Sequence, residues 1–170
     1  GSKRDSRVEY SELPSIPRTD FQFSFVFKTS SDEGIIFYGA NKIHEDFISI
    51  YVKDRLLVFS YNPGAGVAVM RSSQPVNADE WHSVIAERKN EMGSLYVDGF
   101  LQSNGNSRGS ATARHIDLKP PYYVGGLNKT VTQMSHSNTE GPRFRVGRVF
   151  ELSMDVKPRR NTGVMMSVHG

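Results

Sequence analysis

Apolar and polar residues alternate along much of this chain, a pattern that is typical of β-strands with one buried face. The strongest example is the segment 21–28, in which every second residue is phenylalanine. No segment shows a helical period of apolar residues, so the pattern predicts an all-β fold. The strands expected on this basis are 8–10, 21–28, 35–38, 46–52, 56–61, 67–71, 81–88, 94–97 and one within 116–124.

The segment 80–99 illustrates how the expected strands and turns follow one another. Its first half alternates, with Trp81 and Val84 on opposite faces, and the residues at 90–93 are suited to a turn. We therefore predict an antiparallel hairpin, and we expect Trp81 to fill the core rather than to form a ligand platform. The following segment 99–112 is rich in Ser, Gly and Asn, which predicts a loop.

One sequence pattern occurs twice. Residues 21–40 and 150–170 each contain an alternating strand, a lysine, a polar turn, a glycine and an apolar return strand. The lysine precedes the glycine by six residues in both copies, at Lys28 and Lys157. The pattern predicts a hairpin each time, although two hairpins can also arise by chance. The second copy either begins another module or completes the first one, and the expected division is 8–140 and 141–170.

Composition limits the possible classes of protein. The 170 residues suit one domain with at most part of a second, and 18 aromatic residues (10 Phe, 7 Tyr, 1 Trp) are enough to fill a sandwich core. The net charge of +3 is too small on its own to predict a polyanionic partner, no nucleic-acid partner is expected, and no apolar run is long enough to span a membrane. Cysteine is absent, which indicates either a reducing compartment or a core that needs no disulfide.

Several segments arrive in the order found in laminin G-like modules, the family of laminin α chains, neurexins, agrin, perlecan and sex-hormone-binding globulin. The chain most resembles the modules of laminin α chains. The resemblance implies a curved antiparallel β-sandwich of the jelly-roll type, extracellular and commonly arranged in tandem. The chain lacks the Gly-Cys-Ile strand that usually follows Gly-Gly-Leu in the family, and hence its disulfide. The matching segments are 25–30, 34–38, 46–50, 57–59, 64–66, 80–84, 95–99 and 123–127.

The same resemblance implies a calcium site at the rim of the sandwich, built from two side-chain oxygens and two backbone carbonyls. Asp46 and Asp117 match the acidic ligands, and Pro63 and His115 match the carbonyl donors. Two carboxylates would bind calcium weakly, with a Kd of about 10⁻⁴–10⁻³ M. The alternative is that both aspartates are ordinary carboxylates at strand edges. Glu45 either assists the site or is simply solvated.

Basic residues provide a second set of candidates, because clustered cations bind sulfated glycans. Three of them, Arg71, Arg114 and Lys119, are expected near the calcium rim. The alternative is that these charges are solvated turn residues or protect an edge strand from aggregation. The remaining candidates form two clusters, one of Arg143, Arg145 and Arg148 and one of Lys157, Arg159 and Arg160.

Other motifs add little. Asn128 begins an Asn-Lys-Thr acceptor for N-glycosylation, which also occurs frequently by chance. There is no nucleophile elbow, no cysteine nucleophile and no Glu-x-Asp carboxylate pair, so no enzymatic activity is expected. The five histidines lack the spacing of zinc ligands; they are His44, His82, His115, His136 and His169.

These observations favour a secreted adhesion module of the extracellular matrix. It would recognise acidic or sulfated glycans such as heparin, or a glycosylated receptor such as dystroglycan, at a rim that holds calcium, with a tandem neighbour of the same family possible. One alternative is a carrier of a steroid-like molecule, although the phenylalanine-rich strand favours a filled core. A second alternative is a sandwich enzyme that acts on polysaccharides.

Overall fold

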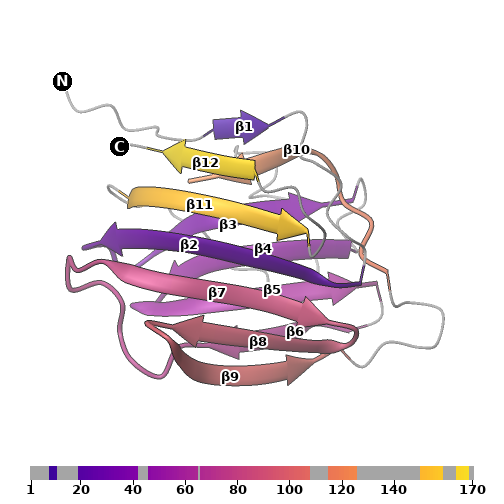
Figure 1. Ribbon diagram of the computed structural model, residues 1–170, viewed down its shortest axis with the longest axis horizontal. Helices are drawn as coiled ribbons and strands as arrows, with labels where there is room; N and C mark the ends of the chain where they lie inside the picture. The colour runs from indigo at the N-terminus through magenta and orange to yellow at the C-terminus, as the bar shows by residue number, and fades with distance from the viewer. Residues whose placement is uncertain are drawn as a thin grey trace.

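The computed structural model describes residues 8–10, 19–41, 46–64, 66–107, 115–125, 150–158 and 164–168. Their strands form two six-stranded antiparallel sheets that pack face to face (Figure 1). This arrangement confirms the predicted all-β sandwich. In spatial order the first sheet is β1 (Val8–Tyr10), β10 (Lys119–Val124), β3 (Gly34–Ala40), β4 (Asp46–Lys53), β5 (Leu56–Pro63) and β6 (Ala68–Arg71). The second sheet is β12 (Val164–Val168), β11 (Phe150–Pro158), β2 (Phe21–Thr29), β7 (His82–Lys89), β8 (Met92–Val97) and β9 (Phe100–Asn106).

The phenylalanines of β2 fill the space between the sheets. Phe21 and Phe23 are almost completely buried, and both reach the opposite sheet. The ring centroids of Phe23 and Phe37 are 4.8 Å apart, and those of Phe21 and Phe59 are 6.3 Å apart. Aromatic rings in such contact stabilise the core beyond the area that they bury. This filled interior argues against a carrier that holds its ligand between the sheets.

The prediction that Trp81 fills the core is wrong. Its side chain is 53% exposed, and the Lys28 ammonium lies 5.5 Å from the ring centroid. The register explains this result, because Val84 lies opposite Phe25 and Ala86 opposite Phe23. Residues opposite one another in neighbouring strands share a face of the sheet, so the face of β7 that carries Val84 and Ala86 is the buried one.

The same buried face of β7 ends in a charged residue. Arg88 lies opposite Phe21 and is only 1% exposed. Its guanidinium carbon is 5.1 Å from the centroid of the Tyr61 ring, which provides a cation–π contact inside the sandwich. Burial is the main influence on this group, and it lowers the pKa of Arg88 from its ordinary value, against the opposing effect of Tyr61.

The expected hairpin between 21–28 and 35–38 is also wrong. β3 pairs with β4 and β10, so the chain crosses to the other sheet after β2. The crossing turn is tied to the β4–β5 turn, since the Arg55 N–H donates to the Asp32 carbonyl at 3.0 Å. Alternation reveals which residues are buried, but it does not reveal which strand is the partner.

The second copy of the sequence pattern does form a hairpin. β11 pairs with β12, and it also pairs with β2 along its whole length, from Phe150 opposite Thr29 to Pro158 opposite Phe21. The two copies therefore share a sequence pattern without sharing an arrangement of strands. The proposed division at residues 140 and 141 lies outside the described part of the chain and stays a prediction.

The loop predicted at 99–112 is in part a strand. β9 pairs with β8 and also contacts β6, where the Ser103 hydroxyl accepts from the Arg71 N–H at 2.9 Å and donates to its carbonyl at 3.0 Å. A side chain at Gly105 would collide with the Met70 sulfur, so this residue must be small. Polar composition concealed β9 because an edge strand held by such contacts needs few apolar residues. No helix long and apolar enough to cross a membrane occurs among the described residues.

Candidate functional site

Three segments that are distant in sequence meet at one rim of the first sheet. Asp46 begins β4 and lies opposite Pro63, the last residue of β5. Asp117 lies two residues before β10, whose first residue, Lys119, is opposite Ala40. We call the group formed by Asp46, Pro63 and Asp117 the Asp46 rim.

A hydrogen bond joins the two aspartates that were predicted as calcium ligands. The Asp117 N–H donates to Asp46 Oδ2 at 2.9 Å across 71 residues of sequence. The start of β4 is fixed as well, because the Asn41 N–H donates to the Asp46 carbonyl at 2.9 Å. Asp46 is half-buried and Asp117 is exposed. The structure thus brings the two residues together at an accessible edge.

A glycine leaves space beside the Asp46 carboxylate. Gly64 has φ +92°, and an added Cβ would lie 2.9 Å from Asp46 Oδ1. The Asn62 side-chain oxygen accepts from the N–H groups of Gly64 at 2.8 Å and Gly66 at 3.1 Å, which shapes this loop. Gly64 is not among the predicted site residues, although the Asn-Pro-Gly-Ala-Gly segment is typical of an unusual backbone.

The oxygen groups at the Asp46 rim fit a hard cation such as calcium. Calcium takes six to eight oxygen ligands, and carboxylates and backbone carbonyls are its usual protein donors. His115 is exposed two residues before Asp117, so its carbonyl belongs to the same approach to β10. No group of three or more His, Cys, Asp or Glu side chains able to hold a metal occurs in the described ranges. Two carboxylates would therefore depend on carbonyls, water or an incoming ligand to complete the coordination.

The basic residues expected around this rim are not all there. Lys119 lies close to Asp117, as expected. Arg71 lies elsewhere, because its partner in β5 is Val58, five residues before Pro63. At a strand rise of about 3.4 Å per residue this is about 17 Å along the sheet. The predicted placement of Arg71 at the rim is wrong, since turn lengths and register cannot be read from its position in sequence.

The other candidates have different outcomes. Lys157 lies in β11 opposite Gln22, and thus in the second sheet. Glu45, Arg114, Asn128, Arg143, Arg145, Arg148, Arg159 and Arg160 lie outside the described residues, and their roles stay predictions.

One histidine makes an ion-pair contact of its own. His82 Nδ1 lies 2.8 Å from Asp98 Oδ2, and the Ser83 N–H donates to Asp98 Oδ1 at 2.9 Å. Desolvation acts to raise the pKa of Asp98, but the hydrogen bonds from His82 and Ser83 outweigh it and hold the pKa below its usual value. This arrangement fixes the turn between β8 and β9.

Comparison with known proteins identifies the family. Residues 27–146 match the model of the laminin G domain. The mouse basement membrane-specific heparan sulfate proteoglycan core protein is 34% identical over 87% of this chain and 4% of its own length. Human pikachurin is 34% identical over 76% of this chain and 13% of its own length.

A solved structure shows the same fold. The structure of mouse laminin α1 chain domains LG4-5 superposes with a TM-score of 0.74 at 18% identity, over 98% of this chain and 45% of that chain. The chain thus spans only a small part of the curated relatives that it matches. The predicted resemblance is confirmed: the chain belongs to the laminin G domain family.

Proposed function

We propose that this chain is an adhesion module of the extracellular matrix, and that it binds acidic or sulfated glycans, or a receptor that carries them, through calcium held at the Asp46 rim. The observation that carries the proposal is the hydrogen bond from the Asp117 N–H to Asp46 Oδ2, which joins two predicted ligands. Membership of the laminin G domain family supports a binding module. One relative, the mouse basement membrane-specific heparan sulfate proteoglycan core protein, is by its name a basement-membrane protein, which supports an extracellular location.

Calcium held by two carboxylates would leave coordination positions for the oxygens of an acidic sugar. The residues of this chain contribute the rest of the recognition. Lys119 is exposed near Asp117 and offers a cation to the same ligand. Gly64 keeps the approach to Asp46 open, because any side chain there would meet the carboxylate. Because the rim is accessible, we propose a binding function rather than an enzymatic one.

The test is the binding of a glucuronate-containing oligosaccharide in millimolar calcium and again in excess EDTA. At the rim itself, followed by the NMR signals of Gly64 and Asp117, we expect binding in calcium, loss of binding in EDTA, and loss of binding in Asp46→Asn. The matched control is Asp79→Asn, which makes the same change of charge at a turn with φ +57° that asparagine tolerates. The Asp79 N–H donates to the Thr29 carbonyl at the end of β2, and the turn that follows β2 is bonded to the β4–β5 turn at the opposite end of β4 from Asp46, so Asp79 lies away from the rim.

Equal binding at the rim by the wild type and by Asp46→Asn in calcium would contradict the proposal. The proposal would also be contradicted if the oligosaccharide shifted the NMR signals of Gly64 and Asp117 in the wild type equally in calcium and in EDTA.

A further inference from the structure

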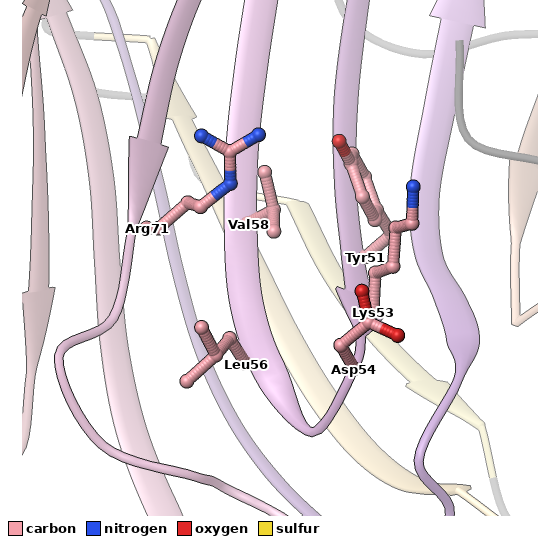
Figure 2. Close-up of a pocket in the computed structure, with 6 residues that line it drawn as sticks. All are labelled: Tyr51, Lys53, Asp54, Leu56, Val58 and Arg71. Carbon is pink, nitrogen blue, oxygen red and sulfur yellow. The ribbon is translucent and has the colours of Figure 1, made fainter. Parts of the chain in front are cut away.

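A hollow lies on the outer face of the first sheet, at the end where β4 turns into β5 (Figure 2). Leu56 and Val58 of β5 form its floor, and Arg71 of β6 forms one wall. The other wall comes from β4 and its turn, and consists of Tyr51, Lys53 and Asp54. Its volume is about 230 Å³. This is below the range of about 300–1,000 Å³ for sites that enclose a whole small ligand, so it suits one unit of a longer chain.

The two cations of the hollow have no partner in the described part of the chain. The side chains of Arg71 and Lys53 make no hydrogen bond or ion pair with any described residue. Figure 2 shows the Arg71 guanidinium beside Val58, across β5 from Tyr51 and Lys53. With Asp54 the hollow carries a net charge of +1, which favours a ligand with a negative group. The planar fork of arginine suits the paired oxygens of a carboxylate or sulfate.

The floor and walls of the hollow are held in place. Val58 is 2% exposed and Tyr51 is 4% exposed, and both belong to an apolar cluster on this face that is separate from the core. Arg71 is anchored because its backbone N–H and carbonyl are both bonded to the Ser103 hydroxyl. A rigid site loses less conformational entropy when it binds.

The combination of an apolar floor and unpaired cations fits a sugar better than it fits a simple anion. The face of a pyranose ring presents C–H groups, and its edge carries hydroxyl and acidic substituents. Leu56 can cover the ring face while Arg71 reaches the acidic group. An extended acidic peptide would instead satisfy its backbone groups at a strand edge, and the floor of the hollow belongs to β5, which is paired on both sides.

We propose that this hollow binds one sulfated or uronate sugar unit without calcium, with Arg71 and Lys53 pairing with the acidic group and Leu56 contacting the ring above Val58. The site is distinct from the Asp46 rim. Lys53 lies seven residues along β4 from Asp46, or about 23 Å at the usual strand rise. The hollow therefore does not depend on the function proposed for the rim, although both sites lie on one sheet and favour the same class of ligand.

The test uses a heparin tetrasaccharide in excess EDTA at low salt, with NMR signals of the Val58 methyl groups and the Arg71 Nε–H as site-specific readouts. We expect saturable shifts of both. Arg71→Ala should weaken the binding seen at Val58 about tenfold, the effect of losing about 1.4 kcal/mol of charge-assisted hydrogen bonding. Asp54→Asn should tighten it about two- to fivefold by removing the opposing charge. Asparagine tolerates the φ of +51° at this position, so the turn is kept.

Two controls separate this site from general attraction of a polyanion. Lys89→Ala removes one positive charge from an exposed residue of β7, in the other sheet, and should leave the Val58 titration unchanged. Leu56→Ala keeps every charge but removes part of the floor, and should weaken binding of the tetrasaccharide more than binding of inorganic sulfate.

The assignment is overturned if Lys89→Ala weakens the Val58 titration as much as Arg71→Ala does. It is equally overturned if a hexaglutamate peptide binds at Val58 as well as the tetrasaccharide does, since the ligand class would then be an acidic peptide. Binding at Val58 only in calcium would refute the independence of the two sites. Because the supporting readouts are made at the hollow in EDTA, failure of the rim proposal leaves this test intact.

Discussion

Replacement of Gly64 by alanine tests whether the space beside Asp46 holds the rim together. The new Cβ would lie 2.9 Å from Asp46 Oδ1, which is closer than real Cβ atoms approach other atoms, so the carboxylate must move. Movement of this carboxylate weakens its bond to the Asp117 N–H. The variant should therefore lose both stability and affinity for calcium.

Gly99 provides the matched control. It has φ +83°, close to the +92° of Gly64, but an added Cβ at Gly99 would meet nothing within 4 Å. Both alanine variants introduce a side chain into a left-handed backbone, at a cost of about 1–2 kcal/mol. Only Gly64→Ala also disturbs a hydrogen bond, which contributes about 1 kcal/mol. The predicted costs are thus about 1–2 kcal/mol for Gly99→Ala and about 2–3 kcal/mol for Gly64→Ala.

Thermal unfolding followed by circular dichroism in EDTA measures the difference between the two variants. A further loss of about 1 kcal/mol corresponds to a melting temperature lower by about 2–4 °C in a domain of this size. Calcium titration then separates strain from site geometry. Gly64→Ala should weaken calcium binding about tenfold, as the loss of a residue that supports a ligand does, and Gly99→Ala should not. Equal melting temperatures and equal calcium affinities for the two variants would refute the reasoning.

Two further predictions concern pH. Burial, with a smaller contribution from Tyr123, raises the pKa of Tyr38 to about 12, so the unfolded chain loses this proton first as the pH rises above 10. The free energy of unfolding should fall by about 2–3 kcal/mol between pH 10 and 12. Tyr38→Phe, measured by urea unfolding, should remove this fall. An unchanged dependence of the unfolding free energy on pH in the variant would contradict the role of Tyr38. Asp98 has a lowered pKa in the folded state, so its contribution is complete above the unfolded value of about 4 and is lost as the pH falls through the folded value. The Asp98 side chain is 47% exposed, so Asp98→Asn should reduce the loss of unfolding free energy at acid pH by no more than about 1 kcal/mol. A larger loss of unfolding free energy at acid pH in the variant would overturn the pairing with His82.

The sequence was most informative where one residue type repeats at a fixed period. Alternating phenylalanines in 21–28 identified β2 and its buried face, because only a strand places every second residue on one side. The same logic could not decide which face of β7 is buried. That choice depends on β2 lying beside β7, where Val84 meets Phe25, and this pairing is a tertiary fact.

Some residues of the candidate site could be predicted from the sequence and others could not. The family resemblance selected Asp46 and Asp117, and the structure joins them across 71 residues. Gly64 was not selected, because its role depends on the distance to a side chain of the neighbouring strand. The hollow around Arg71 was missed for a similar reason. It is formed by three strands whose register places Tyr51, Val58 and Arg71 side by side, and no pattern within a single strand encodes that.

A calcium titration of the metal-free protein, followed by amide NMR, shows whether the Asp46 rim holds calcium. We expect saturable shifts at Asp46, Gly64 and Asp117 with a Kd of about 10⁻⁴–10⁻³ M, and their loss in Asp46→Asn. Amide signals at these three residues that stay fixed in millimolar calcium, or that shift equally in Asp46→Asn, would contradict it.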